Sequence, residues 1–201
     1  MDARAKPNQL NQPKYKKKEI KYSGIYSRSL ITSSITLPIT SIGKNIQETI
    51  EKTISNKFEG KCVVEGFIQP NSSKVITFSS GIVKGVYIMF EVVFECQVCC
   101  PVEGMLIQCV AKNITKAGIR AESSDETPSP VVVFITRDHH YAMTYFATIQ
   151  EGDKFIARVI GQRFELNDKY VSIIAELVDS NKEKEKEKEK EKKPRLVIES
   201  D

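Results

Sequence analysis

Tryptophan is absent from this chain of 201 residues, and only two histidines and five cysteines occur in it. No apolar run approaches the roughly 20 residues that a helix needs to cross a bilayer, which excludes a membrane-spanning helix. The residues after Met1 are basic and polar without an apolar core, so we expect no secretory signal peptide. Without export, a reducing compartment is the default, and the cysteines are expected to be free thiols.

Signatures of catalysis and of metal binding are also lacking. No nucleophile with a paired base stands out, and residues 81–85, with a glycine at each end, are too sparse for a phosphate-binding loop. Cys96 and Cys99 lie in an apolar strand pattern that points them to opposite faces, and no second pair with zinc-ligand spacing exists. Buried thiols that act as small hydrophobic side chains fit this pattern better than a zinc site. We therefore expect no catalytic residue, no metal and no cofactor.

The charge that is present lies mainly at the two ends. The formal net charge is +4, yet residues 1–22 carry seven basic and two acidic side chains, and residues 180–201 carry eight and seven. The body between them, with 15 basic and 17 acidic side chains, is slightly acidic. The basic arm could bind nucleic acid, act as a localisation signal or solubilise the chain. Both ends are too polar to bury a core, so we expect flexible tails, although residues 195–198 form a short apolar end that can dock on a surface.

The first half of the body predicts a small α+β unit. Residues 26–37 are rich in Thr, Ser and Ile, which is typical of a strand. From Ile42 to Phe58 an apolar residue recurs every fourth position, which indicates an amphipathic helix that Ser41 would cap and Gly60 would end. Strand patterns follow at 61–68, 74–78 and 86–99. One helix on an antiparallel sheet is the architecture that this order indicates.

The second half predicts a small barrel. Five strand candidates lie at residues 105–114, 118–122, 131–135, 154–161 and 170–177, with a short helical stretch between the third and the fourth. This is the layout of a five-stranded OB-type barrel. The strand before residue 101 runs directly into the barrel, so the two halves should be tightly joined. The predicted division is a flexible basic arm at 1–22, a tip domain at 23–100, a barrel at 101–179 and a Lys/Glu-rich tail at 180–201.

Several segments resemble a known family in their order. Residues 104–118, 133–137 and 152–163 resemble the S-one-type RNA-binding OB domain. The helix after Gly43 and the strand starts at Gly60 and Gly66 resemble the tip domain that precedes it in the stalk subunit of multisubunit RNA polymerases. That subunit is the seventh of RNA polymerase II, or E-prime of the archaeal enzyme. The sequence departs from the family by its tails, by a short loop after Ile135 and by Arg120, where the family often carries an aromatic residue. Such divergence is similar to that of the copies in large cytoplasmic DNA viruses.

The resemblance implies a non-catalytic stalk subunit of a DNA-dependent RNA polymerase. Such a subunit pairs with a second, mostly helical subunit, docks on the large core subunits through its tip, and faces nascent single-stranded RNA with its barrel. It also implies an intracellular site of transcription: the nucleus or the cytoplasm, or a viral factory or virion if the chain is viral. Two alternatives stay open, a free-standing single-stranded RNA-binding factor in translation or RNA decay, and an oligomeric structural protein.

Strand parity suggests an RNA-contacting surface on the barrel. If Ile119, Ala121 and Val133 fill the barrel, Arg120 and Phe134 project outward together, a cation beside an aromatic ring on which a base can stack. Residues 101–179 carry eight basic and eleven acidic side chains, so binding should be weak, local and salt-dependent. The alternative is ordinary solvated charge around a half-buried ring, and His139 and His140 are expected to lie in a loop that packs on the barrel. The candidate RNA-binding residues are Lys112, Lys116, Arg120, Phe134, Arg137 and Arg163.

A docking surface on the polymerase is expected in the turns of the tip domain. Glycine allows another backbone to approach closely, and an exposed Phe67 or Ile82 would supply apolar anchor area. The alternative, that both side chains belong to the core, stays open. The candidate docking residues are Phe67, Pro70, Gly81 and Ile82.

Overall fold

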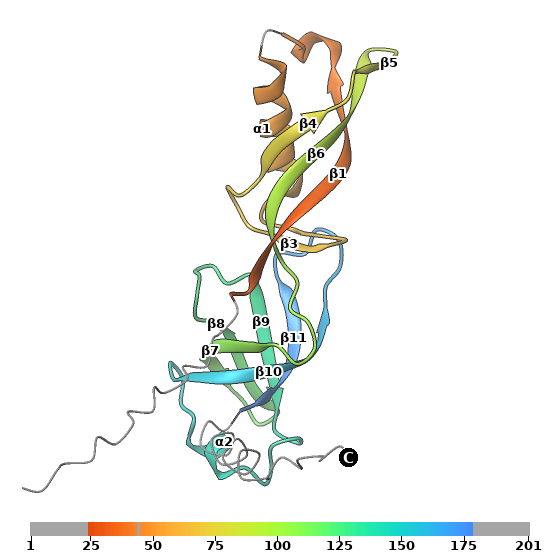
Figure 1. The fold of residues 1–201 in the computed structure, drawn as a ribbon. Coiled ribbons are helices and arrows are strands. Elements are labelled where there is room, and N and C mark those ends of the chain that lie inside the picture. Colours follow the sequence, from red (N-terminus) through yellow and green to blue (C-terminus); the bar gives the residue numbers. More distant parts are fainter. Residues whose placement is uncertain (1–23, 44, 179–201) are drawn as a thin grey trace, which may run out of the picture.

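The computed structural model describes residues 24–43 and 45–178, which form an α+β protein made mostly of strands. A first sheet and the longer helix make up the upper part of Figure 1, and a closed barrel makes up the lower part. The predicted arm at 1–22 and tail at 180–201 lie outside the described residues, and the limits at residues 23, 100 and 179 stay predictions. The elements of the first part are β1 (Tyr26–Pro38), η1 (Ile39–Ser41), α1 (Ile46–Phe58), β2 (Cys62–Val63), β3 (Gly66–Ile68), β4 (Lys74–Phe78), β5 (Ile82–Lys84) and β6 (Tyr87–Cys99).

The two long strands β1 and β6 form the frame of the first sheet. They pair antiparallel over their whole length, from Tyr26 opposite Cys99 to Pro38 opposite Tyr87. β3, β4 and β5 pair in turn with the other edge of β6. Alternate residues of β1 and β6 are buried, as a half-covered strand requires, and α1 lies on that face with Ile50 and Ile54 fully buried. The helix on an antiparallel sheet is therefore present as expected.

Two local predictions in this part are wrong. Ser41 does not cap the helix, because the N–H of Ile42 bonds back to the carbonyl of Ile39 (3.3 Å) and closes a separate 3-10 turn. α1 then begins at Ile46, after Asn45. The single strand expected at 61–68 is split into β2 and β3, which pair with each other as a hairpin. Gly66 makes this possible, since its φ is +134° and a Cβ there would lie 2.5 Å from the carbonyl oxygen of Cys99.

The second part is a closed barrel. Its elements are β7 (Leu106–Ile114), β8 (Gly118–Ser123), β9 (Val131–Thr136), α2 (Thr144–Thr148), β10 (Lys154–Arg163) and β11 (Val171–Leu177). Around the barrel the strands follow the order β10-β11-β9-β8-β7, and β7 returns to β10. All neighbours are antiparallel except β9 and β11, which run parallel. The helical stretch expected over 138–149 is a single helix of five residues.

The two parts share core and hydrogen bonds. Cys62, Phe67 and Cys99 of the first part are buried in the same cluster as the barrel interior. The N–H of Cys62 donates to the carbonyl of Asp168 (2.8 Å). A core that continues from one part into the other agrees with the tight junction expected from the strand that runs into the barrel.

Glu126, in the β8–β9 loop of the barrel, accepts hydrogen bonds from the first part. The donors are the Tyr26 hydroxyl (2.8 Å) and the Gln69 side-chain amide. Burial, followed by the hydrogen bond to Glu126, raises the pKa of the Tyr26 phenol well above its usual range. The carboxylate thus joins the start of β1 and the end of β3 to the barrel.

The cysteine side chains are distributed between the cores of the two parts. All five cysteines are free, four of them buried, with Cys96 in the core of the first sheet and Cys99 in the barrel core. The opposite facing of these two side chains is therefore confirmed. Over residues 24–43 and 45–178, no helix has the length and apolar character to span a bilayer, and no three His, Cys, Asp or Glu side chains gather as a metal site would need.

Candidate nucleic-acid interface

Arg120 and Phe134 lie directly opposite each other on β8 and β9. The next strand continues the row, with Ile174 of β11 opposite Phe134. Phe134 is 40% exposed and Ile174 52% exposed, and Arg120 is exposed beside them. The row therefore presents one cation and two apolar side chains on the outer surface of the barrel.

The barrel interior explains why these side chains point outward. Ile119, Ala121, Val133 and Ile135 alternate with them along β8 and β9, and each of the four is buried in the barrel core. Because successive side chains of a strand alternate between faces, their neighbours must point away from the core. The predicted outward projection of Arg120 and Phe134 is thus observed. Val132 has the same strand parity as Phe134, yet it is only 4% exposed.

Glu122 lies between two of the candidate cations. One oxygen of its carboxylate is 3.5 Å from Nη1 of Arg120, and the other is 3.7 Å from Nζ of Lys112. Lys112 reaches it because the register of β7 against β8 shifts between Ala111 and Asn113, which leaves Lys112 as the extra residue of a bulge. The structure therefore brings Lys112, Arg120 and Phe134 together, with an acidic group among them.

Lys116 and Arg137 meet at the end of the barrel where β7 turns into β8. Nη2 of Arg137 donates to the carbonyl of Thr115 (3.2 Å), and its guanidinium lies over the ring of Phe146, 5.5 Å from the centroid. Lys116 follows Thr115 in the same turn and is exposed. Arg137 thus has a structural task in holding the turn, and Lys116 is the freer cation of the two.

Arg163 lies farther along the outer face of the barrel. It pairs in register with Ser172, two residues along β11 from Ile174, and its guanidinium contacts Glu165 (3.3 Å). The neighbouring Gln162 contacts the sulfur of Cys100, at the end of the barrel that meets the first sheet. Arg163 is therefore on the face of the Arg120 row but toward the junction.

Two residues that matter in this region, Ile174 and Glu122, were not singled out from the sequence. The parity of residues 171–177 could have placed Ile174 on the outer face, whereas the contacts of Glu122 depend on the bulge in β7. His140 is buried in the loop after β9, which agrees with the expected packing on the barrel. In the assigned tautomer its Nδ1 donates to the carbonyl of Thr136 (2.8 Å), and its Nε2 accepts from the N–H of Leu177 (2.9 Å).

The four candidate docking residues have different surroundings. Phe67 is 6% exposed and packs in the barrel core, so it cannot serve as an exposed anchor, and the expectation that it docks is corrected. Gly81 is packed against its own sheet, where a side chain would not fit, because a Cβ there would lie 2.4 Å from the side chain of Ile88. Pro70 is exposed in a turn, and Ile82 is 57% exposed. Ile82 is the candidate that offers apolar area.

The hairpin of β5 and β6 carries this area at the far end of the first sheet (Figure 1). Lys84 pairs with Tyr87, which leaves a two-residue turn in which Gly85 adopts a φ of +63°. The exposed apolar residues of the hairpin are Ile82, Val83, Val86 and Tyr87. We call these four residues the hairpin tip. Exposed apolar side chains gathered at one hairpin end are typical of a protein contact.

No protein-family model matches the chain. Among known proteins, it is 24% identical over 172 residues to a protein of Acanthamoeba polyphaga mimivirus named "Putative DNA-directed RNA polymerase subunit", and the match covers 77% of this chain and 83% of that protein. Among solved structures, an uncharacterized protein of Methanocaldococcus jannaschii matches with a TM-score of 0.32 and 16% identity, over 40% of this chain and 97% of the other.

Proposed function

We propose that the chain is a subunit of a DNA-dependent RNA polymerase of a large DNA virus. The observation that carries this proposal is the similarity to the mimivirus protein, which bears the name of such a subunit and matches over 77% of the chain. The match covers more of the chain than either the first part or the barrel alone contains, so we take both parts to serve the shared function. The subunit acts inside the cell, where viral genes are transcribed, or in the virion.

Within the polymerase, the chain acts as the stalk subunit. Two features support this. The barrel has the strand order of an OB-type fold, with the short helix between its third and fourth strands. The first sheet with its helix precedes the barrel, in the order of the stalk subunit that the sequence resembles. In that role the chain is an accessory subunit, without catalysis or a cofactor of its own.

Two surfaces would then have separate partners. The hairpin tip docks on the large core subunits, since it offers exposed apolar area at the end remote from the barrel. A helical stalk subunit is the second protein partner. The row of Arg120, Phe134 and Ile174 contacts nascent single-stranded RNA, since a ring beside a cation can stack a base and bind its phosphate.

Affinity purification tests the proposal. A tagged full-length chain, expressed in cells that contain the transcription machinery it serves, should copurify with large polymerase subunits in near-stoichiometric amounts. Recovery of the chain with RNA but with no polymerase subunit would instead support a free-standing RNA-binding factor. Recovery with neither would leave only a structural role and would overturn the proposal.

A further inference from the structure

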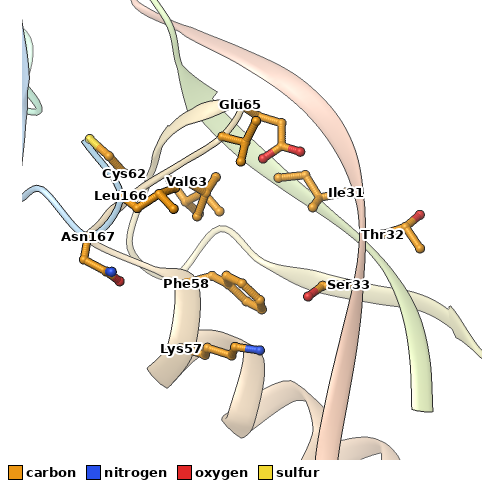
Figure 2. A pocket seen from close by; sticks show the side chains of 12 residues that line it. Ile31, Thr32, Ser33, Lys57, Phe58, Cys62, Val63, Glu65, Leu166 and Asn167 are labelled. Atoms are coloured by element: carbon orange, nitrogen blue, oxygen red, sulfur yellow. The ribbon is translucent and has the colours of Figure 1, made fainter. Parts of the chain in front are cut away.

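A groove of about 320 Å³ lies where β1, the end of α1, the β2–β3 turn and the β10–β11 loop meet. Figure 2 shows Ile31, Phe58, Val63 and Leu166 around it. Seven of the twelve residues that line it are apolar, and Glu65 and Lys57 stand at opposite ends of it in the view of Figure 2. The groove is therefore mainly apolar, with an acidic end and a basic end.

One wall of the groove is an open strand edge. Among the described residues, β1 pairs with β6 alone, so its other edge carries no strand. Nζ of Lys57 donates to the carbonyl of Ser34 (3.3 Å), which shows that this residue turns its backbone toward the open edge. Residues two apart in an antiparallel strand direct their backbone groups to the same side. Thr32, which lines the groove, and Leu30, which lies beside it, therefore present their N–H and C=O groups to the open edge, as a strand that accepts an added strand does.

A segment of this chain has the chemistry that such a groove would bind. In residues 1–23 and 179–201, Leu196-Val197-Ile198 is the only run of three apolar residues. Two of them are β-branched, which favours an extended conformation. Arg195 precedes the run and Glu199 follows it, so its charges are opposite in sign to Glu65 and Lys57 at the two ends of the groove.

The segment is long enough to reach the groove from its own barrel. Asn167 lines the groove, and eleven residues lead from there to Val178, so the two lie at most about 40 Å apart. Leu196 lies eighteen positions after Val178, and this length of chain can span about 59 Å when extended. A tether of this length holds the segment near the groove at an effective concentration on the order of 1 mM.

We propose that residues 195–199 bind in this groove of the same chain as an added strand, parallel to the edge of β1. Arg195 lies against Glu65 and Glu199 against Lys57, which sets the direction of the strand. Leu196 and Ile198 share one face of the strand and enter the groove, while Val197 faces away. Binding covers the open edge of β1, which would otherwise be free to pair with another chain.

Hydrogen exchange of the full-length chain tests this. The amides of Leu30 and Thr32 should be protected in the wild type, and should exchange about tenfold faster in the double variant Leu196→Asp/Ile198→Asp, if a short strand binds with a Kd on the order of 0.1 mM. Val197→Ser is the matched control and should leave the protection unchanged. Neither variant alters a residue of the described fold, so loss of protection cannot come from unfolding.

Charge reversal and dilution complete the test. Glu65→Arg should reduce the protection, and addition of Arg195→Glu should restore it. Protection that is independent of protein concentration supports binding within one chain. Protection that disappears on dilution would show that the segment of a second copy binds in the groove. Equal exchange in the wild type and in Leu196→Asp/Ile198→Asp would show that this segment does not bind there. Either result overturns the proposal.

Discussion

Arg120 and Phe134 pair directly across the β8–β9 ladder, and Glu122, two residues along β8, lies with one carboxylate oxygen 3.5 Å from Nη1 of Arg120. The same carboxylate contacts Lys112 with its other oxygen. A surface that would attract RNA therefore carries its own competing anion. RNA binding depends on the balance between the attraction of the phosphates and this internal ion pairing.

Loss of the aromatic ring and the cation should weaken RNA binding. Phe134→Ala removes a stacking surface worth about 1–3 kcal/mol per base, so affinity for a single-stranded oligonucleotide should fall about 5- to 150-fold. Arg120→Ala should lower the affinity and also reduce the slope of log K against log salt by about one, because one phosphate contact is lost. Lys84→Ala, which removes an exposed cation of β5, is the control and should change little in the isolated chain. Titration at several salt concentrations gives both quantities, and unchanged binding in both variants would remove this row from the site.

Replacement of Glu122 by glutamine should strengthen RNA binding. The neutral side chain keeps its size but releases Lys112 and Arg120 for phosphate contacts, and the face loses one negative charge. We expect a several-fold gain in affinity at low salt that diminishes as salt is raised. Glu103→Gln, a neutralisation of an exposed acid before β7, controls for the change in net charge. An equal gain in both variants would show that Glu122 has no local effect.

Loss of the Glu126 carboxylate should destabilise the junction. Glu126→Ala leaves the half-buried Tyr26 hydroxyl without its acceptor and the Gln69 amide without a partner. The free energy of unfolding should fall by about 1–3 kcal/mol, which is measured by denaturant unfolding. Tyr26→Phe removes only one of the two hydrogen bonds and should cost less. A Glu126→Ala protein as stable as the wild type would contradict the view that this residue joins the two parts.

Stability should fall at alkaline pH. Burial raises the pKa of the Cys62 and Cys96 thiols to about 11 and that of the Cys99 and Cys109 thiols to about 12. The pKa of a thiol in the unfolded chain is about 8.5, so on raising the pH the unfolded chain releases these protons before the folded chain does. The free energy of unfolding therefore falls as the pH rises from about 9 through the folded-state pKa values. Unfolding midpoints measured between pH 7 and 11 should therefore decrease, and Cys109→Ala should make the decrease shallower. A midpoint independent of pH over this range would mean that the thiols are not buried as described.

The hairpin tip should be needed for assembly but not for folding. Ile82→Asp places a charge on an exposed side chain, so the isolated chain should keep its stability while its recovery with polymerase subunits falls at least tenfold. Ile174→Asp is matched in exposure, lies on the barrel, and should leave the recovery unchanged. Phe67→Ala, in contrast, should cost about 3–5 kcal/mol of folding stability. Equal recovery of the Ile82 variant and the wild type would exclude the tip as a docking surface.

Local patterns explain which features could be predicted from the sequence. The outward pairing of Arg120 and Phe134 follows from the period of two in each strand, and α1 follows from an apolar residue at every fourth position. Phe67 could not be placed, because the same strand parity serves a surface or a core, and its burial depends on the barrel that packs beneath β3. The contacts of Glu122 depend on a bulge in another strand, and those of Glu126 on residues 57 and 100 positions away. Such relationships between distant segments leave no local signal in the sequence.

The central claim is membership of a polymerase, and one measurement tests it most directly. The full-length chain is purified by a tag after nuclease treatment of the lysate, so that RNA cannot bridge it to other proteins, and the recovered chains are identified and quantified. The account predicts that the largest polymerase subunits are recovered in near-stoichiometric amounts with the wild type and with Arg120→Ala/Phe134→Ala, and are lost with Ile82→Asp. Recovery of the wild-type chain after nuclease treatment without any polymerase subunit would contradict this claim.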